Sequence, residues 1–130
     1  MLEWDSKYET GISAVDDQHK ELFKMAKELS YAIETEEELD CGFLMAKLEV
    51  YSLYHFTSEE HLMQKYGYPD IEEHMKEHKK FRIKILAMKD RCLDDQHKEA
   101  RIELLSYLEN WLKTHTIEID QKYVPYLKRS

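Results

Sequence analysis

The sequence predicts an all-α protein, an up-down-up-down four-helix bundle with an ordered N-terminal arm. Three observations lead to this prediction. The 130 residues include only three Gly and two Pro, so the chain has few residues that interrupt helices. Apolar residues recur every three or four positions through four long segments, the period of a helix with one buried face. The connections between these segments are short, which makes consecutive helices antiparallel neighbours.

Residues 1–15 contain aromatic and aliphatic side chains without a helical period, and we expect them to pack on the bundle as an ordered arm. A first helix follows, with Asp16 or Asp17 as its N-cap and an end near Thr35. Its apolar stripe also carries a histidine and consists of His19, Leu22, Phe23, Ala26, Leu29 and Ile33.

The second and third helices are separated by the break at residues 67–70, where Gly67 suits a left-handed helix end and Asp70 suits an N-cap. The second helix starts after the acidic run 36–40, and its buried stripe consists of Leu44, Leu48, Tyr51, His55, Glu59, Leu62 and Tyr66. The stripe of the third helix consists of Ile71, His74, His78, Phe81, Ile85, Met88 and Cys92.

The fourth helix begins around Asp94 and carries a regular stripe of Leu105, Leu108, Leu112 and His115. The chain beyond it is less regular, and we expect it to close at Pro125. Asp120 follows His115 by five residues, about 140° around an ideal α-helix, so the two cannot share a face of such a helix. Either Asp120 lies at the surface, or a π-type turn or helix end near residues 116–119 brings it inward.

The composition limits the function and the location of the protein. The length of 130 residues fits one domain, 1–130, and the net charge of −8 argues against nucleic acid or an anionic membrane as the main partner. No apolar run approaches the roughly 20 residues of a membrane span, and the acidic start is no signal peptide. We therefore expect a cytoplasmic protein in which Cys41 and Cys92 are free thiols.

Five histidines and a glutamate lie on the apolar stripes at one end of the predicted bundle. In an up-down-up-down bundle, the start of helix one, the end of helix two, the start of helix three and the end of helix four share one end. Buried polar groups need partners, and a metal is the simplest partner for all six at once. The six candidate ligands are His19, His55, Glu59, His74, His78 and His115.

The other two histidines are predicted not to be ligands. His61 follows His55 by six residues, about 240° around the helix, and should face solvent. His97 belongs to DDQHK (94–98), an exact repeat of residues 16–20, but it starts helix four at the opposite end of the bundle.

Four motifs carry a family resemblance: Gly11-Ile12-x-x-Val15-Asp16-x-Gln18-His19, His55-Phe56-x-x-Glu59-Glu60, His74-x-x-x-His78 and His115-x-x-x-x-Asp120. In this order and on these helices they closely resemble the bacterial hemerythrins, from Trp4 to Tyr123. The resemblance implies a single hemerythrin-like domain with a non-haem di-iron centre (Fe²⁺/Fe³⁺, bridged by oxo or hydroxo) that binds O₂ reversibly. Imidazole and carboxylate ligands suit iron, although manganese or zinc would also bind them.

The resemblance also implies a role for each ligand. His74, His78 and His115 bind one iron, His19 and His55 bind the other, and Glu59 and Asp120 bridge both. The first iron is then six-coordinate, whereas the second keeps one position open for O₂. Tyr123 fits the family pattern and is expected near the site.

Reversible binding requires that the open position stay dry. The candidates for its wall lie one turn from a ligand, and ordinary core packing is the alternative for each of them. Leu112 occupies the position of the oxygen-pocket leucine of the family. The six candidates are Leu22, Phe23, Phe56, Phe81, Trp111 and Leu112.

The expected function is O₂ carriage, storage or delivery without catalysis. An O₂ or redox sensor acting on a downstream protein partner is one alternative, and a di-iron peroxidase or nitric-oxide-reducing enzyme is another. The sequence does not decide among them.

Overall fold

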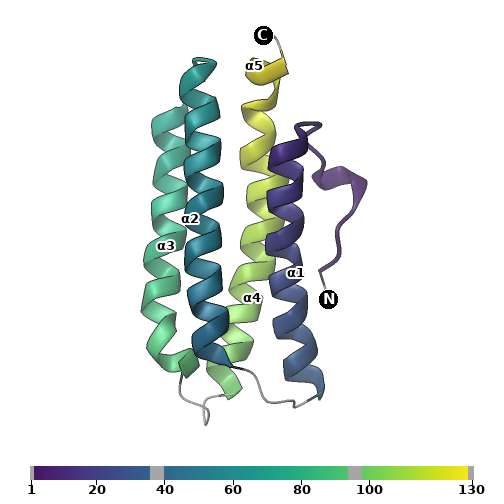
Figure 1. The fold of residues 1–130 in the computed structure, drawn as a ribbon, viewed down its shortest axis with the longest axis vertical. Coiled ribbons are helices and arrows are strands. Elements are labelled where there is room, and N and C mark those ends of the chain that lie inside the picture. Colours follow the sequence, from purple (N-terminus) through teal and green to yellow (C-terminus); the bar gives the residue numbers. More distant parts are fainter. Residues whose placement is uncertain (1, 36–39, 94–97, 129–130) are drawn as a thin grey trace.

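Four long helices form the body of the molecule in the computed structural model, which describes residues 2–35, 40–93 and 98–128. They are α1 (Ser13–Thr35), α2 (Cys41–Lys65), α3 (Ile71–Leu93) and α4 (Lys98–Thr114). Each helix packs on the next, and α4 packs on α1, so the four form a closed square. The α2–α3 connection lies at the same end as the start of α1 and the end of α4 (Figure 1). The predicted up-down-up-down bundle is therefore confirmed.

The α2–α3 connection is a Schellman turn. Gly67 has a φ of +69°, and its N–H donates to the carbonyl oxygen of Gln64, while the N–H of Tyr68 donates to that of Met63. The predicted left-handed glycine is thus confirmed, and α3 begins at Ile71, directly after Asp70.

The start of α1 differs from the prediction. The helix begins at Ser13, so neither Asp16 nor Asp17 is its N-cap. The Asp16 carboxylate instead accepts hydrogen bonds from the N–H and the hydroxyl group of Thr10, both at 2.8 Å, and from the N–H of Gly11 at 3.2 Å. Asp16 therefore ties the preceding segment to the helix.

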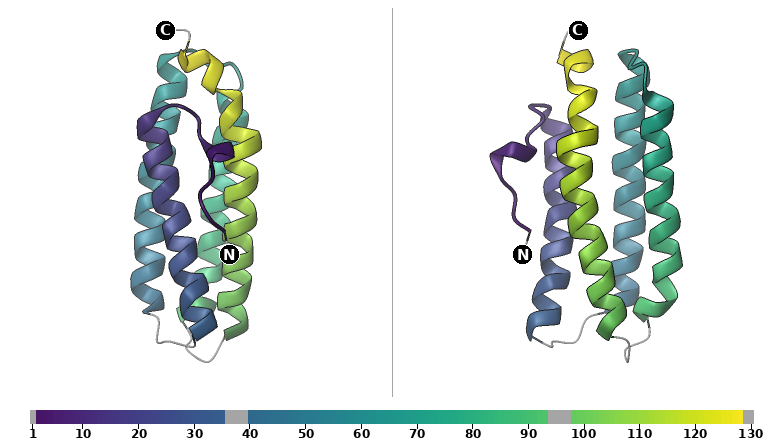
Figure 2. Two further views of the ribbon diagram at one scale, coloured as in Figure 1. Left: turned by 90° about the vertical axis from the view of Figure 1, so that its right-hand side faces the viewer. Right: turned by 180° about the vertical axis from the view of Figure 1, so that it is seen from behind.

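The N-terminal arm is ordered, as predicted. It contains a short 3₁₀ helix, η1 (Ser6–Tyr8), and lies along α1 and α4 (Figure 2). Trp4 and Tyr8 pack on Phe23 of α1, with ring centroids 5.2 and 4.8 Å away. The N–H of Leu2 donates to Glu109 of α4, so the arm is fastened to both helices.

The chain continues as helix beyond α4. A π-helical segment, η2 (His115–Ile119), is followed by a 3₁₀ turn, η3 (Asp120–Lys122), and by α5 (Val124–Lys128). The expectation that the less regular stretch after the fourth helix closes at Pro125 is wrong, because α5 runs on to Lys128. Pro125 lies in the first turn of α5, where its missing N–H has no helical partner to lose.

The remaining predictions concern the cysteines, His97, the start of the fourth helix and a membrane span. Cys41 is disulfide-bonded, so the expectation of a free thiol is wrong for this residue, and the side chain of Cys92 lies outside the described residues. His97 and the predicted start of the fourth helix near Asp94 also lie outside them. No described helix has an apolar stretch of the length that crossing a bilayer requires.

The apolar core consists of two clusters, one filling most of the bundle and one at the end where α5 lies. In α2, Phe56 belongs to the larger cluster and Met63 to the smaller one, with Glu59 between them. Polar residues of the bundle thus lie between two apolar layers.

Candidate metal centre

The structure brings all seven predicted ligands into one buried cluster. Five of the seven lie in the long helices: His19 in α1, His55 and Glu59 in α2, and His74 and His78 in α3. The bundle brings these five together, because the start of α1, the end of α2 and the start of α3 lie at the same end (Figure 1). Every side chain in the cluster is at most 3% exposed: His19, His55, Glu59, His74, His78, His115 and Asp120.

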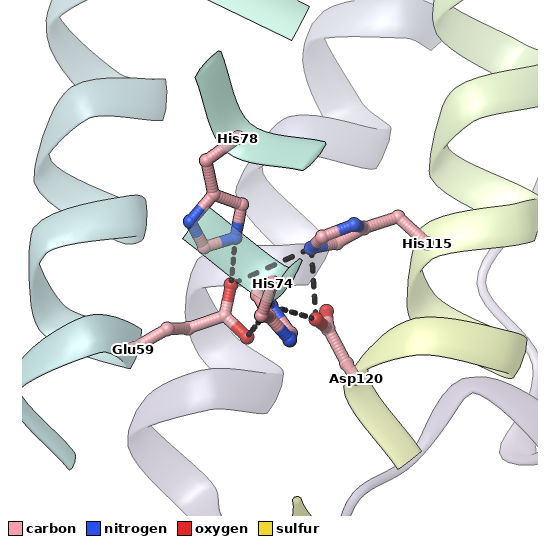
Figure 3. Close-up of side chains that lie close together, drawn as sticks. All are labelled: Glu59, His74, His78, His115 and Asp120. Atoms are coloured by element: carbon pink, nitrogen blue, oxygen red, sulfur yellow. Dashed lines mark ion pairs between the residues drawn. The ribbon is translucent and has the colours of Figure 1, made fainter. Parts of the chain in front are cut away.

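The seven residues form two overlapping groups. In each group, one potential ligand atom per residue lies within 4.8 Å of the others. One group contains three imidazoles and the other contains two, and the two groups share the carboxylates of Glu59 and Asp120. Figure 3 shows the larger group, with the two carboxylates facing each other between the imidazoles. Such an arrangement could hold metal ions, with the two carboxylates common to both groups.

The contacts inside the cluster are those of a group that could hold a cation. His55 Nε2 lies 2.7 Å from a Glu59 oxygen, and Nε2 of both His19 and His115 lies 2.7–2.8 Å from Asp120 oxygens. These short contacts are ion pairs without hydrogen-bond geometry: within the described part of the chain, all five imidazole Nε2 atoms, one Glu59 oxygen and both Asp120 oxygens make no hydrogen bond. Buried polar atoms left in this state are costly, and metal coordination would satisfy all of them.

Asp120 reaches the cluster through the π-helical segment. The backbone N–H of Asp120 donates to the carbonyl oxygen of His115, a bond spanning five residues. This wider turn stacks Asp120 over His115, which an α-helical turn could not do. The π-type turn predicted near residues 116–119 is therefore confirmed, and Asp120 is not a surface residue.

Electrostatics keeps both carboxylates ionised. Burial by itself raises the pKa of Glu59, but His55 and the other imidazoles outweigh it and hold the pKa well below the usual value. Burial and Glu59 also raise the pKa of Asp120, and the charges of His115 and His19 bring it far below its ordinary range. Two buried anions that stay charged require positive charge between them.

The pKa values of His115 and His78, two imidazoles of the larger group, are shifted in opposite directions. Burial lowers the pKa of His115, but Asp120 and Glu59 overcome this and raise it to about 10. Burial dominates at His78 and lowers its pKa to about 4. In the metal-free protein, His115 therefore supplies positive charge that a metal ion would replace.

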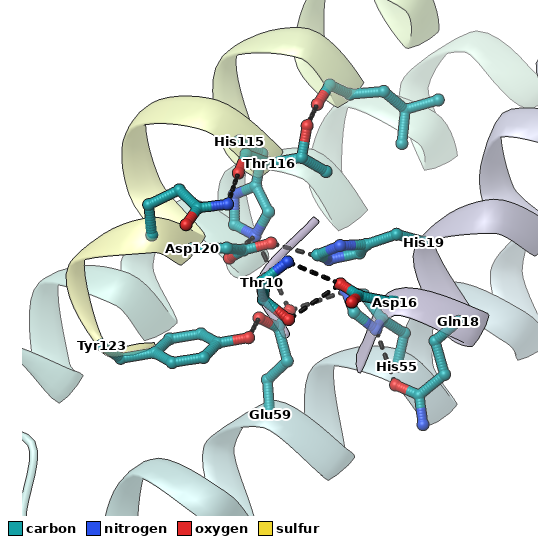
Figure 4. A network of polar contacts seen from close by, with 12 residues as sticks. Thr10, Asp16, Gln18, His19, His55, Glu59, His115, Thr116, Asp120 and Tyr123 are labelled. Carbon is teal, nitrogen blue, oxygen red and sulfur yellow. Dashed lines mark hydrogen bonds and ion pairs between the residues drawn. The ribbon is translucent and has the colours of Figure 1, made fainter. Parts of the chain in front are cut away.

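Two neighbouring side chains hold ligands in place (Figure 4). Gln18 Oε1 lies 2.7 Å from His55 Nδ1, and the Gln18 amide nitrogen donates to Ser58 Oγ at 3.2 Å. Because an amide oxygen only accepts, His55 Nδ1 carries the proton and Nε2 is free to bind a metal. The hydroxyl group of Tyr123 donates to Glu59 Oε2 at 2.6 Å, which agrees with the expected position of Tyr123 near the site.

Sequence reasoning missed the supporting roles of Gln18, Ser58 and Glu60. Gln18 appeared only as part of a motif, and it precedes His19 by one position, which turns it away from the stripe. Glu60 approaches His78 Nδ1 at 3.8 Å. The signal that could have found Gln18 is the need of each ligand imidazole for a partner at its second nitrogen.

The six predicted pocket residues fall into two groups: three aromatic side chains pack over the ligand histidines, and the other three pack elsewhere in the core. Phe56 stacks on His78 at 4.0 Å between ring centroids, and Trp111 stacks on His115 at 4.3 Å, with Phe81 against Trp111. These rings cover the three-imidazole group. Phe23 packs on the N-terminal arm, and Leu22 and Leu112 are core residues at most 3% exposed.

His61 lies outside the cluster. Its side chain is exposed on α2, as predicted from its angle to His55.

Comparison with known proteins places this fold and site in a family. A family model described as the Hemerythrin HHE cation binding domain matches residues 10–127. The chain is 29% identical to bacteriohemerythrin of Clostridium acetobutylicum over 129 residues, 95% of this chain and 99% of that protein. It is 30% identical to bacteriohemerythrin of Methylococcus capsulatus (98% and 97% covered) and 31% identical to myohemerythrin of Theromyzon tessulatum (93% and 89% covered). The chain is thus a member of the hemerythrin family.

Proposed function

We propose that the protein binds O₂ reversibly at a di-iron centre and serves in O₂ carriage, storage or delivery. In this proposal residues 1–130 form a single hemerythrin-like domain. His74, His78 and His115 hold one iron, His19 and His55 hold the other, and Glu59 and Asp120 bridge the pair.

The unequal number of imidazoles is the observation that carries the proposal. The two overlapping groups share the same two carboxylates, but one has three imidazoles and the other has two. The two-imidazole site is one protein ligand short, so it is the one that would accept an external molecule. Two bound ferrous ions would supply electrons to O₂ when it binds, and they would regain those electrons when O₂ is released.

The surrounding residues are suited to binding without turnover. Glu59 and Asp120 remain ionised, so they hold cations without acting as proton donors. The Tyr123 hydroxyl group donates to Glu59, and burial and the Glu59 charge raise its pKa well above the usual value, so it does not readily give up its proton. Apolar layers lie on both sides of the cluster, and every ligand side chain is at most 3% exposed, which favours a dry site.

Anaerobic loading with ferrous iron followed by exposure to O₂ tests the proposal. Visible charge-transfer absorption should appear with O₂ and disappear when O₂ is removed under argon, through repeated cycles. Bands that persist after removal, or a protein that takes up no iron, would contradict reversible binding. Catalytic consumption of hydrogen peroxide or nitric oxide by the loaded protein would favour an enzyme instead.

A further inference from the structure

The seven ligands are buried, so a metal ion needs a route through the surface to reach them. Each of their side chains is at most 3% exposed. One ligand, His74, is at the same time part of the wall of a surface hollow of about 400 Å³. The hollow lies between the start of α3 and the segments η2 and η3. We call it the acidic hollow, because three residues of its wall are carboxylates: Asp70, Glu73 and Glu77.

The helical spacing of α3 places these carboxylates around His74. Asp70 precedes His74 by four residues and Glu77 follows it by three, so each lies one turn away on the same face. The side chain of Glu73 is 74% exposed and that of Glu77 is 39% exposed, whereas His74 is 3% exposed. The acidic hollow therefore leads from carboxylates in contact with solvent to a buried imidazole.

His74 has one nitrogen in the ligand cluster and a second nitrogen without a partner. Its Nε2 lies 3.1 Å from Asp120 Oδ1 and 3.9 Å from Glu59 Oε2, and Figure 3 shows the ring between these two carboxylates. Its Nδ1 is buried and makes no hydrogen bond to any described residue. Gln18 fixes the ring of His55 at Nδ1, but no such bond holds the ring of His74 against a turn towards the acidic hollow.

We propose that the acidic hollow is the entry site for the metal, where a divalent cation collects before His74 passes it to the buried cluster. This rests on the proposed function, because it takes His74 as an iron ligand. Clefts lined by charge of one sign concentrate ions of the opposite sign and raise their association rate. Carboxylate oxygens suit a hydrated divalent cation, and the imidazole of His74 suits iron.

The ion pairs of the hollow leave its carboxylates accessible to a cation. Glu73 pairs with Lys76 at 3.0 Å and Glu77 pairs with Lys80 at 3.2 Å. The two lysine side chains are 65% and 73% exposed, and exposed pairs of this kind contribute little, so a divalent ion displaces them. Lys122 is the basic residue in the wall of the hollow, where the carboxylates outnumber it.

A second hollow that reaches a ligand is less suited to a cation. It has a volume of about 470 Å³ and includes His78 in its wall. The ring of Phe56 stacks on His78 at 4.0 Å and covers it. Two carboxylates line this hollow together with three basic side chains, those of Lys76, Lys79 and Arg82. Charge therefore favours the acidic hollow as the route for a cation.

Stopped-flow mixing of the metal-free, full-length chain with ferrous iron under argon tests the proposal. Trp111 stacks on His115 at 4.3 Å, so its fluorescence reports the filling of the centre. Glu73→Gln/Glu77→Gln should take up iron roughly tenfold more slowly at low salt, and Lys122→Gln roughly twofold faster. Because a route serves both directions, release to a chelator should slow in the double variant as well, while the equilibrium affinity changes less than the rate. Added salt should slow uptake by the wild type more than uptake by the double variant.

Glu72→Gln/Glu99→Gln is the matched control, because it removes the same charge without touching the acidic hollow. Glu72 lies beside Glu73 in the first turn of α3 but lines the second hollow, and Glu99 lies in the first turn of α4. The control should take up iron within about twofold of the wild-type rate. Circular dichroism of each metal-free variant checks that it is folded.

A second measurement detects a cation in the acidic hollow itself. In the zinc-loaded protein the centre is filled with diamagnetic ions, and added Mn²⁺ should broaden the methyl signals of Ile119, which lines the hollow. It should spare Ile102, an exposed isoleucine of α4. Glu73→Gln/Glu77→Gln should lose the broadening at Ile119.

Three results overturn the proposal: wild-type uptake by Glu73→Gln/Glu77→Gln, equal slowing in the control, or broadening at Ile119 that this double variant retains. An equilibrium affinity that falls as far as the rate also overturns it, because the carboxylates then stabilise the bound ion and not its entry. O₂-dependent absorption of the loaded samples reports separately on the proposed function. A protein that loads iron through the hollow but never releases O₂ contradicts that function and leaves the entry site standing.

Discussion

The hydroxyl group of Tyr123 donates a 2.6 Å hydrogen bond to Oε2 of Glu59, and neither side chain is exposed to solvent. The bond connects the residue just before α5 to a carboxylate that both metal groups share. It also leaves the other carboxylate oxygen, Oε1, facing the imidazoles. Tyr123 therefore sets the orientation of Glu59.

Replacement of Tyr123 by Phe should destabilise the protein and loosen the metal site. A hydrogen bond to an ionised group contributes about 1.5–3 kcal/mol, and the buried oxygen would lose its partner. We expect a lower free energy of unfolding in urea and a lower iron affinity in competition with a chelator. Tyr68→Phe is the control, because Tyr68 is also buried and packs on Tyr123, but among the described residues its hydroxyl group makes no hydrogen bond to a ligand. Equal losses in both variants would argue against a specific role for Tyr123.

Gln18 should determine how well His55 binds a metal. Gln18→Leu removes the acceptor at His55 Nδ1, so the ring loses its fixed proton position, and metal affinity should fall about 10–100-fold. Gln18→Glu keeps an acceptor and adds negative charge, which makes the imidazole a stronger donor and should lower the reduction potential of the loaded site. Chelator competition and potentiometric titration measure the two effects.

Gln64→Leu is the matched control, because Gln64 is exposed on α2. This variant should change neither the metal affinity nor the reduction potential. If Gln18→Leu binds metal as tightly as the wild type, His55 is oriented by the surrounding packing and not by Gln18.

The sequence was most informative where a residue type and a helical period coincide. His55 and Glu59 share one face of a helix whose end is marked by Gly67, so both their burial and their level in the bundle could be predicted. The π turn was predicted differently: the family resemblance made Asp120 a ligand, and a ligand five residues after His115 requires a π-type turn or a helix end.

What could not be predicted depends on contacts between distant segments. Asp16 has the residue type of an N-cap, but its carboxylate binds Thr10 and Gly11 of the arm, and only the folded arm shows this. The contact of Gln18 with His55 joins two helices and leaves no periodic pattern in the sequence. Pro125 resembled a stop signal, since the sequence could not show that a new helix begins just before it.

The metal-free protein should be most stable near pH 6.5. The pKa of His115 is raised from 6.5 to about 10. The stabilisation of the folded state by this protonated imidazole is therefore complete below pH 6.5 and is lost as the pH rises to about 10. The pKa of His78 is lowered to about 4, so unfolding is favoured as the pH falls from 6.5 towards 4, where only the unfolded chain takes up that proton. The ionised Glu59 and Asp120 lose their contribution in more acidic solution.

Urea unfolding of the metal-free protein across this pH range, followed by circular dichroism, measures the effect. Each proton changes the stability by at most about 1.4 kcal/mol per pH unit. Loading with metal should reduce the loss at alkaline pH, because a metal ion replaces the His115 proton. His61→Gln, at an exposed histidine, should leave the profile unchanged. A flat profile between pH 6.5 and about 10 would exclude the charged His115.

Leu112→Ala should speed the autoxidation of the O₂-bound protein. Leu112 is 1% exposed and lies three residues before His115, so its truncation opens space beside the ligands and admits water. The variant should also lose about 2–5 kcal/mol of stability. Leu108→Ala serves as the control, because Leu108 is similarly buried but lies one turn farther from the ligands. Decay of the O₂-dependent visible absorption measures autoxidation. If both variants accelerate it equally, general loosening of the core is the cause, whereas acceleration confined to Leu112→Ala identifies this leucine as the barrier to water.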